Sequence, residues 1–142
     1  MLVRVLAYCL EYEEGIAMTA GLSSADEPAV VVRDLTGRMT AWIEIGLPDA
    51  ARLHRGSKLA GRVAVYTHRD IRQLLGSLAG ERIHRAEAIR IHSFDRAVIE
   101  EIAARIDRRT SVALTVSGGD LHFSFADRTF ELAVTESRLQ GT

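Results

Sequence analysis

The hydrophobic positions at the start of the chain repeat with a helical spacing, as the apolar residues of "VRVLAYCL" show. Glutamates gather after them and Gly15 follows, which is typical of the end of an amphipathic helix. We therefore predict a helix over residues 3–14.

Three apolar runs follow, and they are rich in β-branched or alternating residues. Turn residues in "SSADEP" and "DLTGR" separate them. We predict three strands that are antiparallel neighbours, at residues 16–23, 29–34 and 40–46.

A helix and another strand come next. Pro48 and Asp49 mark a helix start and Gly61 lies near its end, so residues 47–61 are predicted to be helical. The run "VAVYTH" then predicts a short buried strand at residues 63–68. A strand, helix, strand order indicates an α/β domain.

The second half of the chain changes its pattern once. Apolar residues at helical spacing predict a helix from Ile71 to Gly80, "AIRIHSF" predicts a strand, and Asp95 is placed to cap a helix that runs to Ile106. The period then becomes two, which predicts a three-stranded antiparallel meander over residues 112–134.

The composition is that of a folded globular protein, with 47% hydrophobic and 26% charged residues among 142. A chain of this length can bury a core of its own, so we expect one α/β (α+β) domain over residues 1–142. The formal net charge of −1 gives no strong attraction to nucleic acid or to a membrane surface.

The apolar runs are far shorter than the roughly 18 residues of a membrane span. The start of the chain has no signal-peptide pattern, and the single cysteine, Cys9, is interpreted as a small buried hydrophobe. We expect a cytoplasmic protein with no membrane partner.

The run "WIEIGLPD" carries a carboxylate in the middle of a predicted strand. Because side chains alternate along a strand, Trp42 and Glu44 share one face and Ile43 lies on the other. Burying the charge of Glu44 is unfavourable unless a cation or hydrogen-bond donors meet it. The alternative is an edge strand with a solvated glutamate, and the sequence leaves both open.

A second pair of acids, Asp26 and Glu27, precedes Pro28 and the next predicted strand. Adjacent strands could bring these carboxylates close to Glu44, and Mg²⁺ prefers a few carboxylate oxygens completed by water. A metal so held can activate water and neutralise the charge that develops on a phosphodiester. Without further context, "DEP" is more often a loop or a helix-like turn.

The segments "RVLAY", "GL", "DEP", "WIE" and "GLPD" resemble, in order and spacing, the YaeQ family of bacterial proteins. The resemblance runs from Met1 through the terminal meander. It implies a mixed central sheet with flanking helices, similar to the PD-(D/E)xK (restriction endonuclease-like) nuclease superfamily, whose core runs helix, three strands, helix, strand.

The resemblance also implies a site. Asp26, Glu27 and Glu44 would hold Mg²⁺ or Mn²⁺, and Glu44 would be the acid of the (D/E)xK element. Its lysine is replaced by Gly46, so a basic residue of the next helix, Arg55 or Lys58, would supply the cation at the phosphate. The last two lie three residues apart and share one helix face.

The family usually has an upstream strand and a Ser-Glu motif at the start of the first helix, so the chain is expected to be an N-terminally truncated form. Two functions stay open. One is a Mg²⁺-dependent phosphodiesterase that acts on DNA or RNA with catalytic Glu44, Arg55 and Lys58. The other, which we favour for this chain, is a non-catalytic binding or interaction module that keeps the fold without the chemistry.

Overall fold

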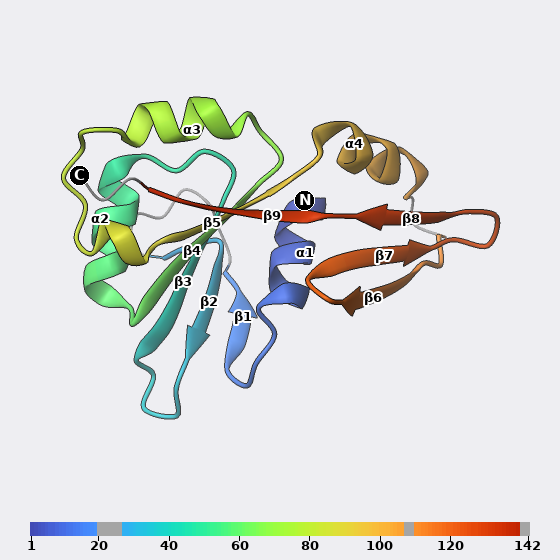
Figure 1. The fold of residues 1–142 in the computed structure, drawn as a ribbon. Coiled ribbons are helices and arrows are strands. Elements are labelled where there is room, and N and C mark those ends of the chain that lie inside the picture. Colours follow the sequence, from blue (N-terminus) through green and yellow to red (C-terminus); the bar gives the residue numbers. More distant parts are fainter. Residues whose placement is uncertain (20–26, 107–109, 140–142) are drawn as a thin grey trace.

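A computed structural model describes residues 1–19, 27–106 and 110–139 (Figure 1). The helices are α1 Leu2–Leu10, α2 Ala50–Leu59, α3 Ile71–Leu78, the 3₁₀ helix η1 Ala86–Ala88, and α4 Arg96–Arg105. The strands are β1 Ile16–Met18, β2 Val30–Arg33, β3 Met39–Ile45, β4 Arg62–Thr67, β5 Arg90–Phe94, β6 Ala113–Ser117, β7 Asp120–Ser124, β8 Thr129–Leu132 and β9 Val134–Arg138.

Within these residues, six strands form a mixed sheet in the order β1-β2-β3-β4-β5-β9, and β6-β7-β8 form a separate antiparallel sheet. The first three strands are antiparallel, as their sequence predicts. β3, β4 and β5 are parallel, because α2 and the α3–η1 segment provide the crossovers, and β9 returns antiparallel to β5. The predicted α/β class, with flanking helices and a meander, is confirmed.

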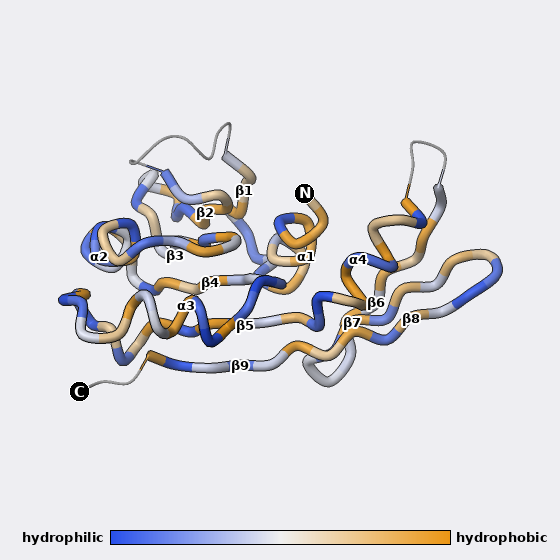
Figure 2. Tube along the Cα trace, turned by 90° about the horizontal axis from the view of Figure 1, so that it is seen from above, coloured by the Kyte–Doolittle hydropathy of each residue, from blue (hydrophilic) through white to orange (hydrophobic). Residues whose placement is uncertain are grey.

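Two hydrophobic clusters cover the two faces of the main sheet. The first cluster lies on the face that carries Ile43, where Leu6 of α1 packs. It extends to Ile102 of α4 and to Phe123 of the small sheet. Leu53 of α2 and Leu74 of α3 pack on the opposite face. Figure 2 shows the small sheet lying beside the main one, with α4 next to it. β3 is therefore an internal strand between two layers.

The predicted helix caps are confirmed at two places. The side chain of Asp49 accepts a hydrogen bond from the backbone amide of Arg52 at 2.9 Å, and Asp95 accepts one from Val98 at 3.2 Å. Each carboxylate satisfies an amide that has no partner inside its helix.

Three predicted boundaries were wrong. The first helix ends at Leu10 and not at residue 14, because the chain turns at Glu11, whose side chain reaches Tyr66 on the sheet. The last alternating run is shared by two strands: β8 completes the meander, and β9 joins the main sheet beside β5. The strand predicted over residues 16–23 ends at Met18, and residues 20–23 lie outside the described residues.

Candidate functional site

Glu44 is buried on β3, with 4% of its surface exposed. β3 pairs with β2 on one side and with β4 on the other, so the alternative of an edge strand with a solvated glutamate was wrong. The side chain lies on the same face as Trp42, beneath α2. A carboxylate at such a place needs a partner that offsets the loss of its hydration.

That partner is Arg52 in the first turn of α2. Its Nε lies 2.5 Å from Oε2 of Glu44, and its Nη2 lies 2.9 Å from Oε1, so the guanidinium and the carboxylate form two parallel hydrogen bonds. Such a bidentate pair is the strong geometry for arginine and carboxylate. The hydrogen bond to Glu44 raises the pKa of Arg52, although burial opposes the shift.

The turn between β3 and α2 explains how Arg52 reaches Glu44. Gly46 has a φ of +89°, a left-handed conformation that residues with a side chain adopt only at a cost. Its amide donates to the carbonyl of Tyr66 at 2.9 Å, and Asp49 then caps the helix. This reversal brings the first turn of α2 back over the end of β3. The left-handed φ of Gly46 also gives a physical reason for glycine at the position where the nuclease motif has lysine.

Arg52 also ties the segment before β2 to this site. Its Nη2 donates to the backbone carbonyl of Glu27 at 2.9 Å. A guanidinium therefore lies between the backbone carbonyl of Glu27 and the carboxylate of Glu44. The predicted approach of the two carboxylates as metal ligands stays a prediction. Asp26, the third predicted metal ligand, lies outside the described residues.

Arg55 and Lys58, the two cations predicted to stabilise the phosphate charge, lie on the exposed side of α2. The buried side of the same helix carries Gly56, which packs directly on the Trp42 ring: a Cβ at this glycine would lie 2.6 Å from ring atoms. α2 therefore approaches the sheet closely and directs its later basic residues outward. The catalytic roles of Arg55 and Lys58 stay predictions.

Arg52 was missed in the sequence interpretation, although a signal for it was present. A cation in the first turn of a helix is unfavourable, since the amino end of a helix carries partial positive charge. An arginine three residues after the capping Asp49 therefore needs a specific anion. The buried carboxylate of the preceding strand is that anion.

A second polar cluster lies on the opposite face of the sheet. Glu11 accepts hydrogen bonds from the Tyr66 hydroxyl and from Arg62 Nη1, the latter at 2.5 Å. His92 stacks on Tyr66 with ring centroids 4.4 Å apart. Burial, and then the hydrogen bond to Glu11, raises the pKa of Tyr66, and burial lowers the pKa of His92. A cavity of about 390 Å³ adjoins this cluster and includes Arg90 in its wall.

Within residues 1–19, 27–106 and 110–139, no group of three or more histidine, cysteine, aspartate or glutamate side chains is arranged to hold a metal ion. In the same ranges no helix is both long and apolar enough to cross a membrane. The described residues around Glu44 do not fit Mg²⁺, because a guanidinium takes both oxygens of the carboxylate.

The comparisons with known proteins identify the family. The model of the family described as "YaeQ protein" matches residues 1–134. Proteins called "Uncharacterized protein YaeQ" from Salmonella typhi and Escherichia coli K12 are each 25% identical over 136 residues, which cover 95% of this chain and 75% of theirs. The chain belongs to the YaeQ family, as the sequence resemblance predicts.

Solved structures agree. The crystal structure of the YaeQ protein from Pseudomonas syringae has a TM-score of 0.80 and 28% identity, and the match covers 99% of this chain and 76% of the other. The YaeQ protein from Xanthomonas axonopodis pv. citri has a TM-score of 0.81 at 24% identity, with 98% and 79% covered, and supports the fold.

Proposed function

We propose that this chain is a non-catalytic binding module that keeps a nuclease-like fold. The observation that carries the proposal is the bidentate pair between Glu44 and Arg52, which uses both oxygens of the carboxylate. Arginine stays protonated at every accessible pH, so it cannot act as a base, and a metal ion would have to displace it. We therefore propose that Arg52 occupies the carboxylate that would bind a metal ion in a nuclease.

The nuclease-like fold is supported by the order of the elements. From α1 to β4 the chain runs helix, three strands, helix, strand, which is the core order expected for the PD-(D/E)xK superfamily. The position of Glu44 on the third strand of this core matches the acid of the (D/E)xK element. The proposal is thus a nuclease-like fold in which Arg52 neutralises the carboxylate at the position of the catalytic acid.

The partner that we propose is a nucleic acid, held through its phosphates by the exposed cations of α2. Arg55 and Lys58 share one exposed side of this helix, three residues apart. Phosphate contacts of this kind give binding without sequence preference and with a strong dependence on salt. Because the net charge is −1, we expect weak binding that is lost as the ionic strength rises.

The test is fluorescence anisotropy with short labelled single-stranded and double-stranded oligonucleotides at low salt. The proposal predicts saturable binding that is equal in Mg²⁺ and in EDTA and that weakens severalfold in Lys58→Gln and Arg55→Gln. Arg72→Gln is the matched control, since this arginine is exposed on a different helix, α3. Equal weakening in all three variants, or no binding at low salt, would remove the nucleic acid as partner.

One observation favours the alternative of a Mg²⁺-dependent phosphodiesterase in the cytoplasm. Arg52 holds the backbone carbonyl of Glu27 beside Glu44, so the backbone of one other predicted ligand adjoins the carboxylate. Cleavage of the same oligonucleotides that requires Mg²⁺ or Mn²⁺ and disappears in Glu44→Gln would establish this alternative. If the oligonucleotides stay intact with every divalent cation, the binding module is the function that remains.

A further inference from the structure

The small sheet ends in an edge strand, β6, which pairs with β7 on one side and with no other strand in the part of the chain that the structure describes. Figure 1 shows β6 at the border of this sheet, with no helix or strand beyond it. An unpaired row of amides and carbonyls binds a further strand through main-chain hydrogen bonds. The edge has no residue in common with α2 or with the pair of Glu44 and Arg52, so an interaction there is independent of the proposed function.

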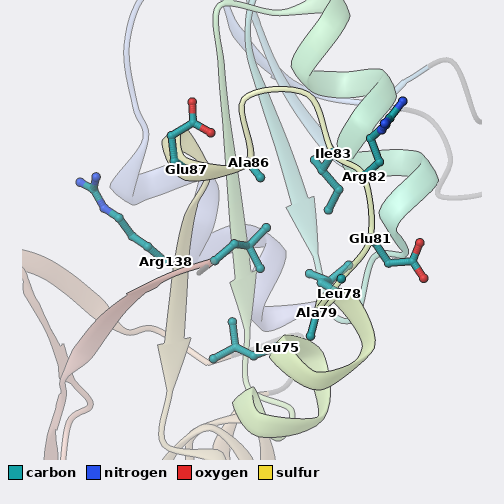
Figure 3. Close-up of a pocket in the computed structure, with 11 residues that line it drawn as sticks. Leu75, Leu78, Ala79, Glu81, Arg82, Ile83, Ala86, Glu87 and Arg138 are labelled. Carbon is teal, nitrogen blue, oxygen red and sulfur yellow. The ribbon is translucent and has the colours of Figure 1, made fainter. Parts of the chain in front are cut away.

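The other edge strands carry features that hinder such pairing. β1 has only three residues, β8 carries Glu131, and β9 carries Glu136 and Arg138. Figure 3 shows the charged end of Arg138 directed away from the apolar lining of a cavity of about 420 Å³ that lies between α3 and the end of β9. The charge of Arg138 therefore stays at the surface of its strand. Shortness and charge are means by which natural sheets keep their edges from pairing.

β6 has neither kind of protection. Its sequence, ALTVS, contains no charged residue and no proline, and its pairing with β7 is regular along all five residues. Among the edge strands within the described residues, β6 is the one that is both longer than three residues and uncharged. The edge is therefore open to a further strand, in contrast to the other three.

An apolar row on β6 is also incompletely covered. Leu114 pairs with Phe123 and Val116 pairs with Leu121, so both lie on the face of the small sheet that joins the hydrophobic core. Leu114 is half-buried, and 47% of Val116 is exposed. The core of this sheet thus ends at an apolar side chain in water, and a strand added beside β6 would cover it.

We propose that β6 pairs antiparallel with β6 of a second copy of this chain, about a two-fold axis at Thr115. In this register Leu114 faces Val116 of the second copy on the core face, and Thr115 faces its own copy on the opposite face. Apolar residues therefore meet apolar residues, and two threonine hydroxyls meet each other, which are favourable cross-strand pairs. The strand is thus complementary to itself, as a two-fold interface requires.

The absence of charge on β6 favours a second copy in particular. A two-fold axis brings the central residue against itself, so a charged residue there would be repelled by its own copy. Thr115 avoids this repulsion. The two small sheets would then form one six-stranded antiparallel sheet. Because two five-residue strands bury a small interface, we expect a weak dimer that dissociates on dilution.

The test is analytical ultracentrifugation at low salt over a series of protein concentrations, in which we expect an equilibrium between monomer and dimer. Thr115→Lys and Thr115→Glu each place two like charges across the axis, and each should weaken the dimer about fivefold. An equal mixture of these two variants should associate more tightly than either variant alone, because the facing charges are then opposite.

Thr129→Lys is the matched control, since Thr129 is exposed on β8 at the other edge of the same sheet, and it should associate as the original chain does. Thr115 is exposed too, and circular dichroism checks that each variant is folded. Four results would overturn the proposal. They are a monomer at every concentration, a dimer that Thr115→Lys leaves unchanged, an equal weakening by Thr129→Lys, and a mixture that associates no more tightly than its two components.

Discussion

At the scale of single residues, the ion pair of Glu44 and Arg52 matters mainly because the loss of one partner would lower the free energy of unfolding. A buried ion pair adds little net stability, because both groups lose hydration when they are buried. Removing one partner, however, leaves the other without compensation in an apolar place. With Glu44 at 4% exposed, the arginine is the partner whose loss matters more.

We therefore predict that Arg52→Met lowers the free energy of unfolding by about 3 kcal/mol, as the breaking of a buried pair does. Glu44→Gln should cost less, about 1–2 kcal/mol, because the amide oxygen still accepts a hydrogen bond from the guanidinium. Urea denaturation measures both. Equal, small losses in the two variants would show that the carboxylate has other partners.

Gly46 gives a second prediction at the level of one residue. Its φ of +89° lies in the left-handed region, while no atom lies within 4 Å of the position of a Cβ. Gly46→Lys, which restores the lysine of the nuclease motif, should therefore lower the free energy of unfolding by about 1–2 kcal/mol through backbone strain alone. Denaturant titration of this variant checks it, and an unchanged midpoint would contradict the backbone argument.

Sequence reasoning singled out the acid, because a charge between Trp42 and Ile45 stands out against an apolar strand, and it gave a cation partner as one of two explanations. It did not find the cation. Three basic residues lie on the following helix at similar spacing, and only the turn at Gly46 and the cap at Asp49 decide which one faces the strand.

Among the helices and strands, the close packing of α2 on β3 is the feature that orients the site. Trp42 is fully buried, and Gly56 contacts its ring face. A helix with a side chain at this point would have to move away from the sheet. The distance between the first turn of α2 and Glu44 would then increase.

Two glycine variants separate this contact from helix propensity. Gly56→Ala should lower the free energy of unfolding by about 1–3 kcal/mol, because overpacking against a fully buried tryptophan exceeds the gain in propensity. Gly76→Ala in α3 should raise it by about 1 kcal/mol, since Gly76 is exposed and nothing lies within 4 Å of a Cβ there. Chemical denaturation of both, side by side, measures the difference. A stabilising Gly56→Ala would contradict the close contact.

The elements themselves were largely predictable, because long periodic segments indicate their own type. The exchange of partners between β8 and β9 was not. Phe130, Leu132 and Val134 continue one alternating pattern without a break, although the chain leaves one sheet for the other at Ala133. A period of two describes which face is buried and carries no information about which strand lies alongside.

For the molecule as a whole, pH acts on stability through two histidines, His92 on β5 and His68 just after the end of β4. Burial lowers the pKa of His92 in the folded protein, and burial also lowers that of His68. The nearby carboxylates of Glu11 and Glu136 oppose the shift at His92, and Arg90 adds to it. The unfolded chain, with a histidine pKa of about 6.5, therefore binds more protons than the folded chain just below neutral pH.

Stability should consequently fall as the pH drops from about 7.5 through about 6.5 towards the lower folded values. His92→Phe, which keeps an aromatic ring on Tyr66, should reduce this slope, while the part due to His68 stays. Urea denaturation at a series of pH values gives the slopes for both proteins. A slope that is equal in the two would mean that His92 does not contribute to it.

We infer that a guanidinium occupies the position of the metal ion beside Glu44, and thermal unfolding with and without Mn²⁺ is the sharpest test of this inference. A cation that binds only the folded protein raises its stability by about 2.7 kcal/mol at one hundred times the dissociation constant. We expect no increase in melting temperature for the original chain and none for Glu44→Gln. A clear increase for the original chain that is absent in Glu44→Gln would contradict the inference and would show that the acidic cluster binds metal despite Arg52.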